Sequence, residues 1–311
     1  EPVKALSITG GRIPNPWFST DLMWDDDLNF EGLAVNWQPA QKGDRFRPFV
    51  TVGYFPITAE DPPSRDEARS LVGAQVGAGW DVAAWQQLRL GVAIYDYRNF
   101  EGKREPNSAF DAINNVELTA DYGSSQYGSG LRQKGNTLFE TNAANDTAIS
   151  RPLYMGLAAK FRPVNLTGEW VLDYWYPTQL ILAADYVYNT AFDKQEIERR
   201  TGLSMDDASA SAWRLGVTVG RPKIREQGDW NASLVYKRVG SDALLDAFTD
   251  SDFGYGGTNL EGFVLGMAYG LDRNTSLGFK YASADTIASP TTVAGDRFGV
   301  DTLQLDLAVR F

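Results

Sequence analysis

The amino-acid sequence predicts an all-β chain, folded as a transmembrane antiparallel up-and-down β-barrel. Three observations lead to this prediction. Strand-length segments with alternating polar and apolar residues recur along the chain, the connections between them alternate between short and long, and aromatic residues gather at the segment ends. A period of two is typical of a strand with one apolar and one polar face. Short turns at one end and long loops at the other are typical of membrane barrels, as are two aromatic girdles.

The last ten residues show the alternation most clearly. Every odd position from Leu303 to Phe311 is apolar, whereas Thr, Gln, Asp, Ala and Arg occupy the even positions from Thr302 onward. A chain that stops on an aromatic residue after such a strand is typical of the closing strand of an outer-membrane barrel. The closing strand therefore predicts which face of the other strands meets lipid.

The same pattern recurs upstream, so that about twelve strands are expected. The stretch Leu166–Tyr176 is left open, because it could extend one of its neighbours. In chain order the predicted strands are Ala5–Ile13, Phe30–Trp37, Phe46–Tyr54, Val72–Trp80, Leu88–Ile94, Leu153–Phe161, Leu180–Tyr188, Trp213–Val219, Trp230–Tyr236, Phe263–Tyr269, Thr275–Tyr281 and Leu303–Phe311.

The connections keep one phase from end to end. Counting back from Phe311 puts every short connection in the periplasm and every long one outside, so residues 1–311 are predicted to form one barrel domain. The short connections lie near Gln38–Asp44, Asp81–Trp85, Arg221–Gly228 and Leu271–Asn274. The long ones lie near Asn15–Asp27, Pro56–Arg69, Arg98–Ser150, Ala191–Ala210, Gly240–Leu260 and Ala284–Val300.

The longest connection, residues 98–150, is polar and rich in Gly, Asn and Ser. A loop of this length in a compact domain is usually functional or disordered. We expect it to fold into the lumen as a constriction, with an outward lid as the alternative. The acidic residues that would then line the constriction are Glu101, Glu105, Asp111 and Glu117.

Composition excludes several function classes. The 311 residues contain no Cys and no His, and the formal charge is −11. Catalysis by Ser-His-Asp or thiolate groups and metal binding through His or Cys are therefore excluded. No apolar run reaches the roughly 18 residues of a membrane-spanning helix. We expect no enzymatic activity and no cofactor.

Orienting each predicted strand by its apolar face identifies charged residues expected to line the lumen. They are Arg12, Arg45, Arg47, Arg89, Lys160, Asp185, Arg214, Lys237, Lys280, Asp306 and Arg310. Arg12 faces inward only if Gly10-Gly11 forms a bulge that shifts the phase. The wall is thus basic although the chain is acidic. Two interpretations stay open: the cations set a field that favours anions, or they pair with carboxylates from folded-in loops.

Two acidic clusters are candidates for Ca²⁺, which takes carboxylate and carbonyl oxygens. They contain Asp25 and Asp27 in one loop and Asp250 and Asp252 in another. The alternative is that these aspartates cap backbone amides in hydrated turns. Neither cluster matches an EF-hand or a nonapeptide repeat.

Longer motifs resemble one family. They are Gly10–Trp17 (GGRIPNPW), Ser19–Leu22, Trp24–Gly32, Gly228–Trp230, Ser241–Ala243, Phe248–Phe253, Gly256–Thr258 and Leu303–Asp306. Together they are similar to the "putative porin" family of Gram-negative outer membranes. The resemblance implies about sixteen strands, with a periplasmic N-terminal segment and further strands before the Gly10 motif. This chain lacks those strands, so it could be part of a larger barrel.

The leading functional hypothesis is a passive diffusion channel for small hydrophilic solutes in the bacterial outer membrane. The alternative is a structural barrel that anchors or sheathes a partner protein and conducts little. Expected partners are outer-membrane lipid and lipopolysaccharide and small hydrophilic solutes, including anions. Further copies of the chain and an additional N-terminal segment are left open as partners. No nucleic-acid surface is expected, because the predicted exterior is acidic or apolar.

Overall fold

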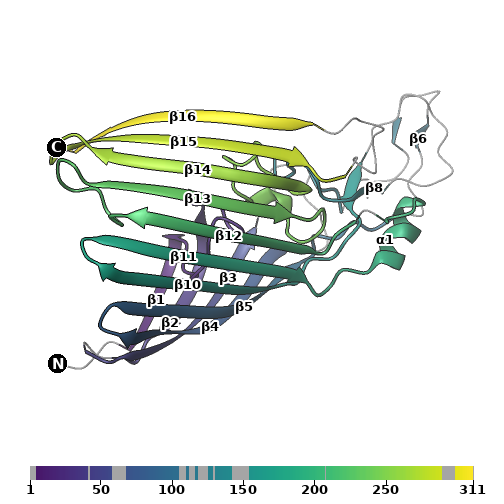
Figure 1. Ribbon diagram of the computed structural model, residues 1–311. Coiled ribbons are helices and arrows are strands. Elements are labelled where there is room, and N and C mark those ends of the chain that lie inside the picture. The colour runs from purple at the N-terminus through teal and green to yellow at the C-terminus, as the bar shows by residue number, and fades with distance from the viewer. Residues whose placement is uncertain are drawn as a thin grey trace.

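The computed structural model describes residues 5–40, 43–57, 68–104, 110–111, 116–117, 125–128, 130–141, 154–206, 208–288 and 298–310. These residues form one twelve-stranded antiparallel sheet in which almost every strand pairs with its neighbours in sequence (Figure 1). In spatial order the strands are β1 Leu6–Pro14, β2 Asn29–Trp37, β3 Phe46–Ile57, β4 Arg69–Ala83, β5 Gln86–Arg98, β10 Pro163–Trp175, β11 Thr178–Asn189, β12 Ser211–Gly220, β13 Trp230–Val239, β14 Leu260–Gly270, β15 Thr275–Thr286 and β16 Gly299–Val309.

Short elements lie in the long connections. Two small sheets pair β6 Phe110–Asp111 with β7 Val116–Glu117, and β8 Leu138–Glu140 with β9 Met155–Leu157. Helix α1, Lys194–Thr201, begins where the side chain of Asp193 accepts a hydrogen bond from the Glu196 amide, and it ends at the left-handed Gly202. A short 3-10 helix, η1, spans Asp246–Phe248.

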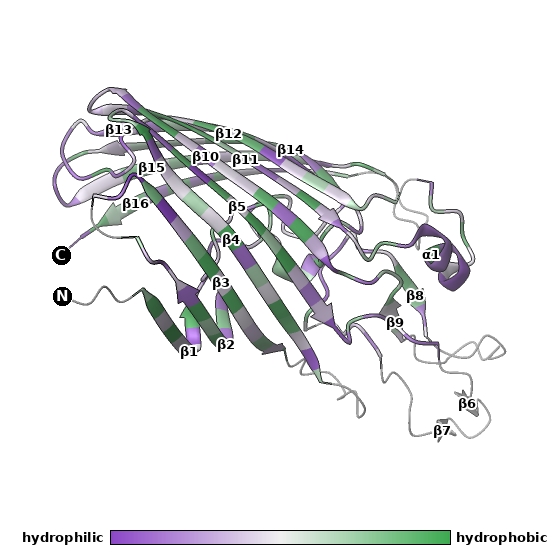
Figure 2. Ribbon diagram, turned by 90° about the horizontal axis from the view of Figure 1, so that it is seen from below, coloured by the Kyte–Doolittle hydropathy of each residue, from purple (hydrophilic) through white to green (hydrophobic). Residues whose placement is uncertain are grey.

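The strands form because alternate residues meet different surroundings. Large apolar side chains are exposed on the convex face, as with Leu305 (75%), Val76 (59%) and Leu215 (57%). Their sequence neighbours point to the concave face, which is buried or polar. Figure 2 shows the resulting alternation of hydrophobic and hydrophilic bands along β3, β4 and β5. Within the described part of the chain, no helix has both the length and the apolar character to traverse a bilayer.

The connections alternate in length as predicted, with the short ones at one end of the sheet and the long ones at the other. The N- and C-terminal ends lie at one end of the sheet, and α1, β6 and β8 lie at the other (Figure 1). The connections at the first end are short, the tightest being Ala84–Trp85 and Tyr176–Pro177. An even number of strands is needed for both termini to lie at one end.

One predicted strand is wrong, and the stretch left open replaces it. Only Met155–Leu157 of the predicted Leu153–Phe161 forms a strand, and it pairs with β8 outside the large sheet. The stretch Leu166–Tyr176 falls largely within β10, which pairs with β5 on one side and β11 on the other. Alternation alone did not separate the two segments, because buried Ala158, Ala159 and Phe161 continue an apolar pattern inside a loop core. The long connection therefore runs from β5 to β10.

The sheet curves strongly but has two edges. β1 pairs only with β2 and β16 pairs only with β15, and no ladder joins β1 to β16 among the described residues. Figures 1 and 2 show the two edge strands on separate parts of the curved sheet. The predicted closure into a barrel is thus not part of the described structure.

A hydrophobic core lies on the concave face, toward the end with the long connections. Its centre is aromatic: Trp24 stacks edge-on against Phe30 and Tyr95, with ring centroids 5.0 and 5.1 Å apart. Trp17 adds a further edge-on contact with Tyr95 at 5.2 Å. Because Trp17 and Trp24 belong to the connection between β1 and β2, that connection is folded inward against the sheet.

Candidate functional site

The inward-folded segment 15–28, between β1 and β2, follows the concave face from β4 to β13. The side chain of Gln75 holds it on β4, accepting a hydrogen bond from the Phe18 amide (2.8 Å) and donating one to the Phe18 carbonyl (2.7 Å). On β11, Asp185 accepts a hydrogen bond from the Thr20 hydroxyl at 2.7 Å. The segment then reaches β12 and β13 through Asp21.

Asp21 lies at the centre of a buried ion cluster. Its carboxylate pairs with Arg214 on β12 and with Lys237 on β13, the latter at 2.9 Å. Lys237 is only 1% exposed and also pairs with Asp250. Burial by itself would raise the pKa of Asp21, but the two cations hold it below its usual value. The cluster thus joins segment 15–28 to the second inward-folded segment, residues 240–259 between β13 and β14.

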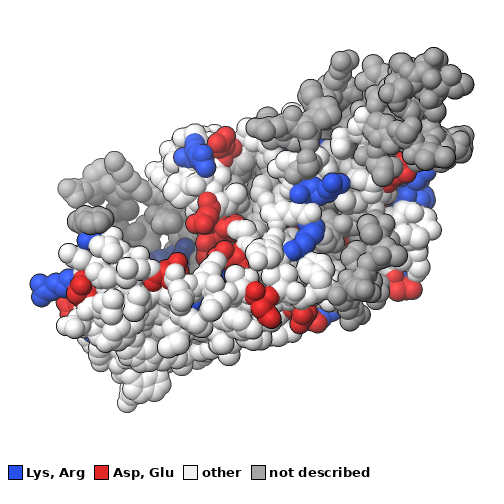
Figure 3. All heavy atoms as spheres, turned by 90° about the horizontal axis from the view of Figure 1, so that it is seen from above, with Lys and Arg blue, Asp and Glu red and all other residues white. Residues whose placement is uncertain are grey.

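The cluster continues toward β16 through Asp252. Lys280 on β15 pairs with this carboxylate at 2.8 Å, and Gln304 on β16 donates a hydrogen bond to it at 3.2 Å. Burial raises the pKa of the nearby Asp26, and the charges of Asp21 and Asp250 add to the shift. In Figure 3, acidic side chains gather near the middle of the view, above a broad surface with few charges.

Three inward cations are therefore paired with carboxylates from the two segments. This favours the pairing interpretation for Arg214, Lys237 and Lys280. The acids reach them from segments 15–28 and 240–259, whereas residues 98–150 were the predicted constriction loop. Here we name these eight residues the charged constriction: Asp21, Asp25, Asp26, Arg214, Lys237, Asp250, Asp252 and Lys280.

Three of the four calcium candidates hold backbone amides or wall cations. Asp25 accepts hydrogen bonds from the Asp27 and Ser251 amides at 3.0 and 2.9 Å. Asp250 and Asp252 bind ammonium groups. No group of three acidic, His or Cys ligands occurs in the part of the chain that the structure describes. The two aspartate runs serve instead to shape turns and to pair with wall cations.

Several other residues that were predicted to line the lumen lie at the end of the sheet with the short connections. Arg47 forms a two-pronged pair with Asp81, with bonds of 2.6 and 2.7 Å, and Arg45 donates to the carbonyls of Asp81 and Val82. Arg310 donates to the carbonyl of Ile224 at 3.1 Å. These arginines stabilise turns at the rim. Asp306 lies opposite Gly278 in the β15–β16 ladder and is exposed.

Arg12 and Lys160 do not lie where the sequence placed them. The β1–β2 ladder runs without a register shift, so Gly10-Gly11 does not change the phase of β1. Ile13 is buried on the concave face, and Arg12 therefore lies on the convex face opposite Glu31. Lys160 is on no strand. It lies in the connection between β5 and β10 and pairs with Glu101 at 3.0 Å.

The acidic candidates from residues 98–150 are not found lining the lumen among the described residues. Glu101 is taken up by the pair with Lys160. Glu105 lies outside the described residues, and only the backbone of Asp111 and Glu117 is described, in β6 and β7.

The described part of that long connection is instead anchored on η1. Tyr127 donates a hydrogen bond to the carboxyl of Asp246, and the Gln133 amide donates another at 3.1 Å. The Asp246 amide donates to the side chain of Asn136 at 2.8 Å. Burial raises the pKa of Asp246 to about 7. These contacts form a latch between residues 127–136 and segment 240–259.

Paired glycines on the concave face were missed at the sequence level. Gly53 lies opposite Gly73, and Gly77 lies opposite Gly91. A Cβ at Gly73 would lie 2.7 Å from the Trp17 ring, and one at Gly77 would lie 2.3 Å from the Phe49 ring. Glycine at successive inward positions of a strand indicates close approach of another group. That signal could have located the inward-folded segment.

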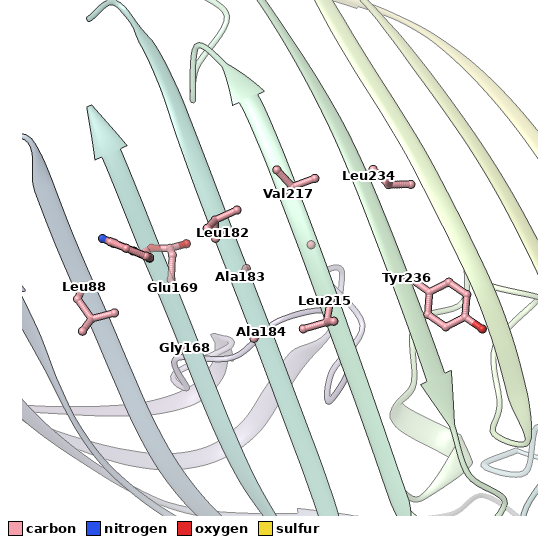
Figure 4. Close-up of a pocket in the computed structure, with 12 residues that line it drawn as sticks. Leu88, Gly168, Glu169, Leu182, Ala183, Ala184, Leu215, Val217, Leu234 and Tyr236 are labelled. Atoms are coloured by element: carbon pink, nitrogen blue, oxygen red, sulfur yellow. The ribbon is translucent and has the colours of Figure 1, made fainter. Parts of the chain in front are cut away.

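The convex face carries an apolar depression of about 530 Å³ between β5 and β13. Figure 4 shows Leu182, Leu215, Val217 and Leu234 around it. The small residues Gly168 and Ala184 lie in its floor. An apolar outer surface and a charged inner one are thus separated by the thickness of a single sheet.

A family model described as "Putative porin" matches residues 1–311. No curated protein matches the chain. A solved structure from work on "the Mechanism Behind the in-meso Crystallization of Membrane Proteins" aligns with 91% of this chain and 78% of its own, at 12% identity and a TM-score of 0.36.

Proposed function

Because the chain belongs to the family described as "Putative porin", we propose that it is a passive diffusion channel for small hydrophilic solutes in the bacterial outer membrane. The observation that carries the proposal is the two-faced sheet. Exposed apolar side chains cover its convex face, and paired charges brought in by two inward segments line part of its concave face. A wall of this kind separates lipid from a water-filled passage.

The proposal includes closure of the sheet around that passage. A strand edge left unpaired in a bilayer would expose backbone amides and carbonyls to hydrocarbon at a cost of several kcal/mol per group. β1 and β16 must therefore pair with each other or with further strands in the membrane. Cysteines at Ser7 and Ala308, one near the short-connection end of each edge strand, would crosslink only if these two strands are neighbours.

Charged residues of the constriction would act on permeating solutes. Lys280 and Asp252 are 34% and 45% exposed at the β15–β16 side, whereas Lys237 is sealed. Solutes would thus pass along β15 and β16, where the constriction is still accessible. The passage is less basic than its wall, because the inward segments bring carboxylates to the wall cations.

One observation favours the alternative function, a structural barrel that sheathes a partner and conducts little. The hydrophobic core of Trp17, Trp24, Phe30 and Tyr95 fills part of the concave face. Such a core narrows the space for solutes and would suit a closed or occupied lumen.

Planar-bilayer recording on the purified full chain distinguishes the two functions. A channel gives steady, ohmic current steps whose size rises with salt concentration. A sheath gives a silent bilayer, although protease protection of the same sample shows that the protein has inserted. Silence from inserted protein would overturn the channel proposal.

A further inference from the structure

A polar cavity of about 610 Å³ lies on the concave face, near the end with the short connections. Arg89 on β5, Glu169 on β10 and Phe49 on β3 contribute to its wall, together with Gln87 and Val171. It lies apart from the charged constriction, whose cations are on β12, β13 and β15. Cavities of about 300–1,000 Å³ suit small organic ligands.

Arg89 is held in this cavity by aromatic rings. Its guanidinium lies 4.0 Å from the centroid of Phe18 and 5.0 Å from that of Phe49. The Gln75 side chain fixes the backbone of Phe18, and Gly91 leaves room for its ring, since a Cβ there would lie 3.1 Å away. Stacking uses the faces of a guanidinium and leaves the donors in its plane available. Arg89 donates no hydrogen bond to any residue that the structure describes.

Glu169 provides an acceptor beside that donor. It lies directly opposite Arg89 in the β5–β10 ladder, yet the two side chains form no ion pair. Within the described ranges Glu169 accepts no hydrogen bond. Arg47 also lines the cavity, but Asp81 already occupies its guanidinium. The cavity therefore presents one available cation and one available carboxylate on adjacent strands.

We propose that this cavity binds a small zwitterion of the α-amino acid class with an apolar side chain. The carboxylate of the solute would bind Arg89, a fork of donors suited to a carboxylate. The ammonium group would bind Glu169, and the side chain would lie against Phe49 and Val171. The inference deepens the proposed function and rests on it, because the solute reaches the cavity by entering the channel.

Equilibrium dialysis of radiolabelled L-leucine against the full chain in lipid nanodiscs tests the proposal. The wild type should bind leucine saturably. Both 4-methylpentanoate, which lacks the ammonium group, and 3-methylbutylamine, which lacks the carboxylate, should compete more weakly than unlabelled leucine. Equal competition by leucine and 4-methylpentanoate would overturn the zwitterion assignment.

Substitutions at Arg89 and at Glu169 test the role of each charge separately. Arg89→Gln should weaken leucine binding roughly 10- to 100-fold, as expected for lost hydrogen bonds to a charged group, and Arg89→Lys should fall between. Glu169→Gln should weaken leucine binding but strengthen that of 4-methylpentanoate, because a like charge is removed. Lys194→Gln, on the surface helix α1, is the matched control and should bind as the wild type does.

Folding and conduction are checked separately. Each variant should keep the heat-modifiable migration of the folded wild type on a gel, and Arg89→Lys takes the place of Arg89→Gln if the latter does not fold. Unchanged leucine binding in folded Arg89→Gln would overturn the site. Conductance without saturable leucine binding would overturn the site and leave the channel. Leucine binding by inserted but silent protein would overturn the channel and leave the site.

Discussion

Lys237 is a buried cation that pairs with two carboxylates of the charged constriction. It is 1% exposed and pairs with both Asp21 and Asp250. Removing it would take from Asp250 its ion pair in a poorly solvated site and would leave Asp21 paired with Arg214 alone. A buried pair of this kind is costly to break, whatever its net contribution when intact.

We expect Lys237→Met to lower the free energy of unfolding by about 3–5 kcal/mol. Part of the loss should be recovered in the double variant Lys237→Met/Asp250→Asn, which removes the carboxylate that loses its ion pair, whereas Asp21 still pairs with Arg214. Urea titrations followed by tryptophan fluorescence would measure both. Lys194→Met, an exposed control in α1, should leave the midpoint in place. A midpoint for Lys237→Met equal to that of the wild type would contradict the buried-cluster description.

Two glycines on one face of β4 give a matched pair. Gly77 adjoins the Phe49 ring and the Leu90 carbonyl, so a Cβ there would come within 2.4 Å of both. At Gly79 the nearest atom to a new Cβ is 3.7 Å away, at the end of Arg47. Gly77→Ala should therefore reduce thermal stability and loosen Phe49, whereas Gly79→Ala should not. Melting curves recorded by circular dichroism would compare the two variants. Equal curves would mean that the Phe49 ring can move aside.

At the scale of elements, the latch on η1 should respond to pH. Burial raises the pKa of Asp246 from 3.8 to about 7, so the folded state holds its proton more tightly than the unfolded state. The stabilisation is fully present below pH 3.8 and is lost as pH rises to about 7. Tyr127, Gln133 and the more distant Arg132 are the groups facing this carboxyl.

Hydrogen exchange at the Gln133 amide should therefore become faster, relative to intrinsic rates, between pH 5 and pH 7.5. Asp246→Asn keeps the shape without the titration, so its protection should change little across the same range. Protection that is the same at all pH values in the wild type would show that Asp246 does not control the latch.

Strand β16 provides the test of the lipid-facing register. Leu305 is 75% exposed on the convex face, and its neighbour Gln304 bonds to Asp252 on the other. Leu305→Arg should cost about 2–4 kcal/mol if it lies near the bilayer midplane. Gln304→Arg should be tolerated, because it meets the Asp252 carboxylate. The refolding yields of the two variants into lipid vesicles would be compared. Equal yields would mean that the register assigned to β16 is wrong by one residue.

The sequence could predict this element pattern because period-two alternation reports which face meets lipid. It identified the strands that flank four of the short turns, such as β12 and β13 or β14 and β15, but it left open β10, which precedes the turn at Tyr176–Pro177. It could not predict that 15–28 folds inward, since that depends on contacts such as Thr20–Asp185 between residues 165 positions apart. It misplaced Leu153–Phe161 because a loop core of small and aromatic residues imitates a strand. It misplaced Arg12 because the positive φ of Gly11 occurs without a register shift.

For the whole molecule, the balance of charge in the constriction should set selectivity. Its aspartates outnumber its cations, and Asp252 is partly exposed to the proposed passage. Wall charges within the Debye length of about 8 Å act on a passing ion, whereas exposed outer loops are screened. The channel should therefore favour K⁺ over Cl⁻, opposite to the preference of the wall cations alone.

Reversal potentials in a KCl gradient would measure this preference. Asp252→Asn should move the potential toward anion preference, and Lys280→Gln should move it the other way. The matched control Lys194→Gln should leave it unchanged. A wild-type channel that prefers Cl⁻ would show that the inward acids do not face the ion path.

The long reach of segment 15–28 has a consequence for the order of assembly. Each pairing within the large sheet except that of β5 with β10 joins strands adjacent in the chain and can form as a local hairpin. Asp21 and Lys237, by contrast, are 216 positions apart, and the pair cannot form until β13 is in place. Contacts of such separation form late, because the entropy of closing the loop must be overcome first. Docking of this segment is therefore completed late: in a chain stalled before β13, Asp21 would lack Lys237, and a chaperone or protease could recognise the loosely held segment as unfinished.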